Sequence, residues 1–240
     1  MDKTELANME ERERNYWWHI GRRQVLRDFL KRHLPGGQWR ILDVGCGTGI
    51  NFGWLRGFGQ VTGLDNADDA LSYCRAKGAY HQLIKGDASD APKGQFDLVT
   101  AFDVLEHVDD VSALTAWHSA LKPGGHLLVT VPAYQWLFGA HDKALQHKRR
   151  YSSALLRTRL RQAGFHIKFI SPFFFFTFPV VAVARLFGKF SRPRATYESA
   201  SAQVGATPVL VGLSQVESGM ISLGLGWPWG SSILAYAVKE

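Results

Sequence analysis

The sequence predicts an α/β fold in which a doubly wound, mainly parallel sheet carries helices on both faces. Between residues 39 and 131, short apolar segments typical of strands alternate with segments of helical periodicity. The first apolar segment ends in a turn, residues 45–49, where every second residue is glycine. Because right-handed crossovers bring the carboxyl ends of parallel strands to one edge of a sheet, the turns after these strands are expected to line one cleft.

The predicted elements follow one another closely along the chain. Residues 4–34 are predicted to be helical, with an aromatic cluster at 16–19, and the Leu-Pro-Gly-Gly sequence at 34–37 ends this helix. The alternating pattern then predicts strands at 39–44, 60–64, 80–84, 96–102 and 125–131, and helices at 48–57, 67–77 and 110–121. After Pro132 it predicts a helix at 152–163, opened by Ser152 and Ser153, and strands at 165–170 and 232–238.

A long segment, residues 172–230, separates the last two strands. It begins with the apolar stretch 172–187, which is too short to span a bilayer and is interrupted by Pro179. We expect a buried helix that roofs a substrate pocket, and an interfacial membrane helix or a dimer contact are the alternatives. A second helix is predicted at 208–225, where Glu217 is the odd carboxylate on a largely apolar face.

The composition fits one globular domain. The chain has 240 residues, of which 46% are hydrophobic and 20% charged, and can bury a sizeable core. Its two cysteines exclude a disulfide framework and favour a reducing cytoplasm, and Cys46 is interpreted as a small apolar side chain inside the glycine turn. The polar N-terminus predicts that there is no signal peptide, and no apolar run is long enough to cross a membrane.

The net charge of +7 indicates anionic partners: an acidic substrate, a membrane surface or nucleic acid. Nucleic acid ranks last, because the basic residues are dispersed and their main cluster, 148–150, lies beside the proposed active site. The expected location is the cytoplasm, with peripheral contact at the inner membrane surface through residues 173–187 left open.

The glycine turn predicts a nucleotide-like ligand. Gly45, Gly47 and Gly49 permit positive φ and let a ligand lie against the backbone at a helix N-terminus. The dinucleotide fingerprint fails because its sixth position is Ile50, and no Lys-Ser or Lys-Thr of a phosphate loop follows. Asp43 would repel a pyrophosphate but suits a positively charged ligand, and S-adenosylmethionine fits this requirement.

Residues 41–131 resemble the class I, Rossmann-like S-adenosylmethionine-dependent methyltransferases. The resemblance rests on successive strand-end motifs in order, namely Ile41–Gly49, Val61–Asp65, Gly86–Ala88, Phe96–Val108 and Leu121–Val129. It implies a seven-stranded sheet, mostly parallel with an antiparallel last strand. It also implies a single domain, 1–240, that comprises a helical lid (1–34), a cofactor-binding half (35–132) and a substrate-side half (133–240) containing the apolar insertion 172–230.

The resemblance also implies a set of cofactor-binding residues. Asp65 would accept the ribose hydroxyls and Asp87 the adenine amino group, while Arg22 of the lid could pair with the methionine carboxylate. For the aromatic cluster of the lid, packing on the sheet is an equal alternative. The full set is Trp18, Arg22, Asp43, Gly45, Gly47, Gly49, Asp65, Asn66, Asp87, Ala88 and Phe102.

Catalysis is assigned to His107, which follows the fourth strand of the motif series. Methyl transfer needs positioning and, for a hydroxyl acceptor, removal of a proton, so His107 is the candidate general base. The substrate-binding candidates come from the same turn and from the segment after the next strand: Glu106, His141, His147, Arg149, Arg150 and Tyr151. A solvated basic turn that caps the next helix is the alternative for 141–151.

No metal is expected from the sequence. The signature of the magnesium-dependent catechol enzymes is not recognisable, and arginines beside the site would oppose a cation. The function predicted is O-methylation of a small or medium-sized, partly apolar molecule, anionic if Arg149 and Arg150 contact it. The alternatives are N- or C-methylation of a small molecule or lipid precursor, and a non-catalytic methyltransferase-like binding protein. The oligomeric state is left open.

Overall fold

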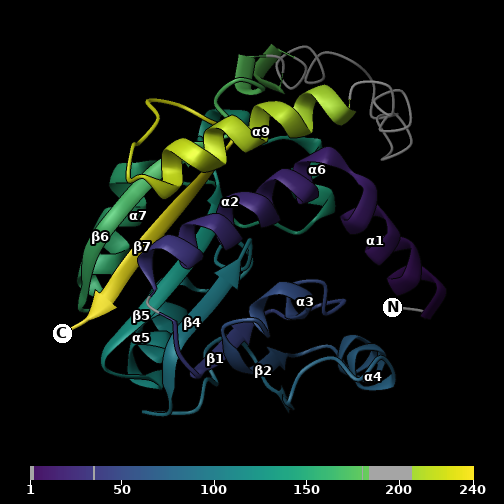
Figure 1. The fold of residues 1–240 in the computed structure, drawn as a ribbon, viewed down its shortest axis with the longest axis vertical. Helices are drawn as coiled ribbons and strands as arrows, with labels where there is room; N and C mark the ends of the chain where they lie inside the picture. The colour runs from purple at the N-terminus through teal and green to yellow at the C-terminus, as the bar shows by residue number, and fades with distance from the viewer. Residues whose placement is uncertain (1–2, 35, 180, 184–206) are drawn as a thin grey trace.

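The computed structural model describes residues 3–34, 36–179, 181–183 and 207–240 and contains one seven-stranded sheet (Figure 1). The strand order is β3-β2-β1-β4-β5-β7-β6, and only β7 runs antiparallel to its neighbours. The fold class predicted from the sequence is therefore confirmed. The strands are β1 (Trp39–Val44), β2 (Gly59–Asp65), β3 (Gln82–Lys85), β4 (Phe96–Phe102), β5 (Leu121–Pro132), β6 (Phe165–Phe173) and β7 (Ser232–Lys239).

Most helices lie close to their predicted positions, and the first two differences concern the N-terminal helix and the residues after the glycine turn. The first predicted helix is two helices, since Tyr16 has the extended dihedral angles φ −80° and ψ 127°. The second correction concerns 48–57, where only four residues form a helix, because the glycine turn occupies the chain up to residue 49. The helices are α1 (Lys3–Asn15), α2 (Trp17–His33), α3 (Phe52–Leu55), α4 (Asp68–Ala76), α5 (Asp110–Ala120), the 3₁₀ helix η1 (Gln135–Leu137), α6 (Ala140–Ala144), α7 (Ser153–Gln162) and α9 (Thr207–Ser222).

The sheet separates two apolar cores. Alternation along β1 directs Leu42 and Val44 into the core beneath α5 and α7, and Ile41 into the core beneath α2 and α9. Figure 1 shows α9 running alongside α2. The two helices approach closely at Gly21, where an added β-carbon would lie 2.6 Å from Oγ of Ser214. Among the described residues, none of the helices has the length and apolarity needed to cross a bilayer.

The apolar stretch after β6 does not begin as the predicted helix. β6 extends to Phe173, residues 174–177 form a turn, and helical residues begin only at 178. Glu217 of α9 explains this turn, because its carboxylate accepts hydrogen bonds from the backbone N–H groups of Phe174 (3.0 Å) and Phe176 (3.1 Å). Glu217, which is only 1% exposed, is the carboxylate that stood out on the apolar face of the predicted helix. Its role is to accept hydrogen bonds from backbone N–H groups of the turn. Residues 180 and 184–187 of the predicted stretch lie outside the described part.

This arrangement predicts that Glu217→Ala lowers the free energy of unfolding by about 1 to 3 kcal/mol, because buried N–H groups lose their acceptor. Urea denaturation followed by circular dichroism measures the change. Glu217→Gln retains a carbonyl acceptor and should lose less. Gln215→Ala, an exposed position on the same helix, serves as the control and should change stability by less than about 0.5 kcal/mol. Equal losses for all three variants would contradict the role of Glu217.

Candidate active site

The glycine turn between β1 and α3 has the conformation that its sequence predicts. Gly45, Gly47 and Gly49 have φ values of 67°, 52° and 78°, which side chains rarely adopt. A β-carbon on Gly45 would lie 2.6 Å from Cγ2 of Val104, the second residue after β4. The turn is therefore pressed against the segment that carries Glu106 and His107.

Acidic side chains line the edge of the sheet next to this turn. Asp65, at the end of β2, accepts hydrogen bonds from the N–H groups of Gly47 (2.9 Å) and Ala67 (2.9 Å). Asn66 donates to Oδ1 of the exposed Asp87 at 3.0 Å. The carboxylates retain free lone pairs for hydroxyl and amino donors, so this edge fits the ribose and adenine of S-adenosylmethionine. Ala88, partly buried, and Phe102, buried at the end of β4, complete the predicted edge.

Asp43 lies beneath the turn rather than at its mouth. Its carboxylate is buried and accepts hydrogen bonds from the hydroxyl groups of Tyr80 (2.6 Å) and Thr100 (2.9 Å). Burial raises the pKa of Asp43 to about 6, although both hydrogen bonds oppose this shift. Asp43 therefore ties the end of β1 to β4 and to Tyr80.

The predicted lid is fastened to the glycine turn. Glu13 of α1 accepts a hydrogen bond from the Thr48 hydroxyl, and Glu10 forms an ion pair with Lys77 at 2.7 Å and a hydrogen bond with Tyr73 at 2.7 Å. Although burial raises the pKa of Glu10, hydrogen bonds from Lys77, Tyr73 and Arg14 lower it to about 2. Glu10 also lines, with Gly49 and Lys77, a cavity of about 300 Å³ beside the turn.

Arg22 of α2 is buried over the carboxyl end of β4. Its guanidinium group lies 4.9 Å from the ring of Trp18 and forms an ion pair with Asp103. Asp103 directly follows β4 and has a φ of 57°. Sequence reasoning placed Arg22 at the site but missed Asp103 as its partner, since the two residues are 81 positions apart.

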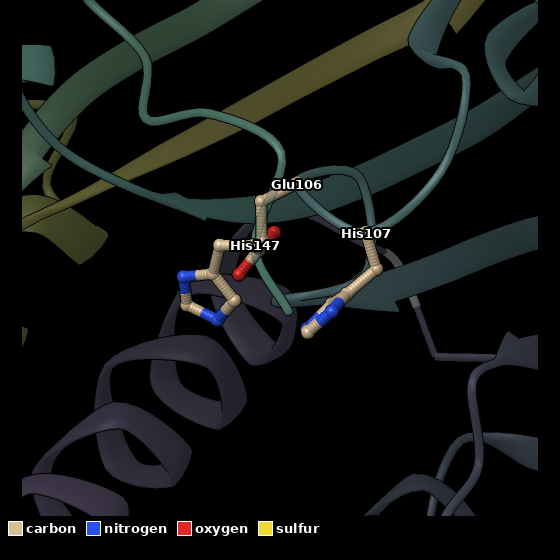
Figure 2. A group of neighbouring side chains, drawn as sticks. All are labelled: Glu106, His107 and His147. Atoms are coloured by element: carbon tan, nitrogen blue, oxygen red, sulfur yellow. The ribbon is translucent and has the colours of Figure 1, made fainter. Parts of the chain in front are cut away.

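Glu106, His107 and His147 meet at this edge of the sheet (Figure 2). Their candidate ligand atoms all lie within 4.8 Å of one another, and the two imidazole rings stand nearly perpendicular with centroids 4.7 Å apart. Glu106 is 1% exposed, and neither of its carboxylate oxygens has a hydrogen-bond partner among the described residues. Burial and the Asp103 carboxylate raise the pKa of Glu106, while burial and His147 lower the pKa of His107.

His147 is oriented by a buried carboxylate. Its Nδ1 lies 3.0 Å from Oδ1 of the fully buried Asp142. The same oxygen accepts a hydrogen bond from Nε of Arg150 (2.7 Å), and Oδ2 accepts one from the N–H of Gly139 (3.0 Å). These bonds hold the pKa of Asp142 well below its usual value, even though burial raises it. The short helix α6, which the sequence did not predict, carries Asp142 and brings His147 to the site.

The other substrate candidates have partners within the protein. Arg149 forms an ion pair with Asp110 at 2.8 Å, and Arg150, besides Asp142, donates to the carbonyl of Ala133 at 3.1 Å. The buried Tyr151 hydroxyl donates to the carbonyl of Leu105 at 3.2 Å. These contacts fix the segment 139–151 against the site. His141 is exposed on α6 and lies outside the cluster of Glu106, His107 and His147.

Comparison with known proteins agrees with this geometry. Residues 17–172 match a family model described as a methyltransferase domain. The chain is 30% identical to a ubiquinone biosynthesis O-methyltransferase of Hydrogenovibrio crunogenus, over 70% of this chain and 81% of that protein. It is 40% identical to the protein of the same name from Alkalilimnicola ehrlichii, but over only 42% of this chain and 45% of that one.

Two solved structures illustrate the shared fold. An S-adenosylmethionine-dependent methyltransferase from Thermotoga maritima superposes with a TM-score of 0.60 at 18% identity, covering 98% of this chain and 97% of that chain. Phosphoethanolamine N-methyltransferase 2 of Haemonchus contortus, solved with S-adenosyl-L-methionine, gives a TM-score of 0.57 at 19% identity, covering 90% of this chain and 52% of that chain. Together, the glycine turn, the acidic strand ends and the matched family model show that the chain belongs to the class I S-adenosylmethionine-dependent methyltransferases.

Proposed function

We propose that the protein transfers the methyl group of S-adenosylmethionine to an oxygen of a small or medium-sized, partly apolar acceptor. The observation that carries this proposal is the cluster of Glu106, His107 and His147. Glu106 and His107 follow closely after Val104, which packs against the glycine turn. A hydroxyl acceptor must lose a proton as it attacks, and His107 is the base that we propose for this proton. The names of the relatives, ubiquinone biosynthesis O-methyltransferases, support oxygen as the acceptor atom.

The surroundings of the cluster favour an apolar acceptor over an anionic one. Arg149 and Arg150 already form ion pairs within the protein, with Asp110, which Arg159 shares, and with Asp142. Aromatic side chains gather after β5 and β6. The ring centroid of Tyr134 lies 5.9 Å from that of Trp136 and 5.4 Å from that of Phe178. An acceptor with an aromatic ring and an apolar chain matches this environment.

We also propose that the acceptor is lipid-like and that the protein collects it at the inner membrane surface from the cytoplasm. Several large apolar side chains among the described residues of 176–183 and 208–229 are exposed, namely Phe176, Val183, Val209, Val216, Leu223, Leu225 and Trp229. Within 172–183 and 207–237, the described residues include one charged side chain, the buried Glu217. An uncharged surface of this kind fits the interfacial region of a bilayer.

The cofactor site predicts that Asp65→Ala weakens S-adenosylmethionine binding by about 1.5 to 3 kcal/mol, since a charge-assisted hydrogen bond is lost. Calorimetric titration with the cofactor measures the difference. Asp68→Ala, an exposed aspartate at the start of α4, is the matched control and should bind normally. Unchanged affinity in a folded Asp65→Ala protein would mean that the ribose is held elsewhere.

The proposed reaction predicts that His107→Ala lowers kcat by roughly 10² to 10⁴ while cofactor affinity is unchanged, because proton removal acts in the transition state. The assay follows S-adenosylhomocysteine formed with phenols and catechols that carry alkyl or prenyl chains. His166→Ala, an exposed histidine on β6, should keep full activity. Methylation of amines but of no hydroxyl compound would contradict the proposed acceptor atom.

The membrane proposal predicts that the protein floats with vesicles of phosphatidylglycerol and phosphatidylcholine, and that the double variant Phe176→Ser, Trp229→Ser binds them several-fold more weakly. The physical reason is the loss of two exposed aromatic side chains from the contact. Val111→Ser, an exposed apolar position on α5, is the control. Absence of wild-type flotation, or equal binding by the double variant, would contradict contact through this surface.

A further inference from the structure

The buried carboxylate of Glu106 has no counter-charge of its own. It is 1% exposed, and neither of its oxygens has a hydrogen-bond partner within the described part of the chain. The nearby guanidinium groups form ion pairs with other carboxylates, Arg22 with Asp103 and Arg150 with Asp142, although Nε of Arg22 has no hydrogen-bond partner among the described residues. A carboxylate in such a place needs either a proton or a cation.

Two imidazoles stand beside this carboxylate in the arrangement that a cation requires. Figure 2 shows the carboxylate of Glu106 directed into the space between His107 and His147. One ligand atom from each of the three side chains lies within 4.8 Å of the others. A small movement of the side chains would bring all three to coordination distance of one ion.

The orientation of His147 also fits a metal ligand. Asp142 holds Nδ1 at 3.0 Å, which leaves Nε2 for another partner. Asp142 is itself fixed by Arg150 and by the N–H of Gly139. A buried carboxylate behind a histidine is the usual outer support of a metal-binding imidazole, because it sets the tautomer and increases the basicity of the ring.

We infer that Glu106, His107 and His147 bind a divalent transition-metal cation of the zinc type. Two imidazole nitrogens and one carboxylate oxygen suit Zn²⁺ and similar ions, whereas Mg²⁺ prefers oxygen ligands throughout. The sequence-based expectation of no metal rested on the missing signature of the magnesium-dependent catechol enzymes and on the arginines beside the site, but Arg149 and Arg150 each form an ion pair with a carboxylate, Asp110 and Asp142. Three protein ligands leave a coordination position open.

The open coordination position suggests a catalytic role for the cation, and this role rests on the proposed function. An acceptor hydroxyl bound to the cation loses its proton to solvent more readily, because the positive charge stabilises the oxyanion. The oxyanion then forms a bond to the methyl carbon as the bond from that carbon to the sulfonium sulfur breaks. The products are the methyl ether, S-adenosylhomocysteine and one proton. His107 then acts as a ligand of the ion that promotes deprotonation.

The test measures metal binding in the full chain without a polyhistidine tag and without an acceptor. After treatment with EDTA, the protein should bind one equivalent of Zn²⁺ by calorimetry, and one of Co²⁺ with a visible absorption spectrum typical of nitrogen and oxygen ligands. Glu106→Gln and His147→Ala should each weaken binding at least tenfold, and Asp142→Asn should weaken it about 10- to 100-fold. His166→Ala, outside the cluster, should bind like the wild type.

Failure of the metal site and failure of the proposed reaction give different results. No Zn²⁺ or Co²⁺ binding by the wild type, or binding unchanged in Glu106→Gln and His147→Ala, would overturn the metal site even if O-methylation is observed. Stoichiometric binding that these variants weaken would support the site even if no hydroxyl compound is methylated, and the proposed reaction alone would then fail. The wild-type Co²⁺ spectrum decides the question if a variant does not fold.

Discussion

The glycine turn after β1 is the constraint on which the rest of the site depends. Its three positive φ values allow the backbone to pass between β2 and β4, and the carboxylate of Asp65 holds it there through the N–H of Gly47. The close contact with Val104 then fixes where the chain leaves β4. Because Asp103, Glu106 and His107 lie within three residues of Val104, the cofactor edge and the candidate acceptor site are positioned by the same turn.

Most of the fold could be predicted because its strands are apolar runs that end in recognisable turns. β4 has its predicted bounds, and Ser152 caps α7 as expected by accepting from the N–H of Leu155 at 3.1 Å. The break at Tyr16 could not be predicted, because helical residues continue on both sides of it. The turn at 174–177 was missed for a different reason, since it depends on Glu217, which lies 43 positions away from Phe174.

The candidate site shows where sequence reasoning stops. The Glu106–His107 pair and His147 were found from motifs, but a basic run such as 148–150 looks the same whether its charges face solvent, a substrate or an internal carboxylate. The structure pairs Arg149 with Asp110, 39 positions earlier, and buries Arg150 against Asp142. The charge that suggested an anionic acceptor is therefore part of the scaffold, and Glu106 is left as a buried carboxyl group without a hydrogen-bond partner among the described residues.

The place of β7 in the sheet has a consequence for folding during synthesis. β7 (Ser232–Lys239) lies between β5 and β6, although it follows both in the sequence (Figure 1). Until the ribosome has released residue 239, β5 keeps an open edge and β6 has no partner. The substrate-side half therefore completes its sheet late, through contacts distant in sequence, whereas β1 to β4 can pair as soon as they emerge. An open apolar edge of this kind invites chaperone binding on the nascent chain.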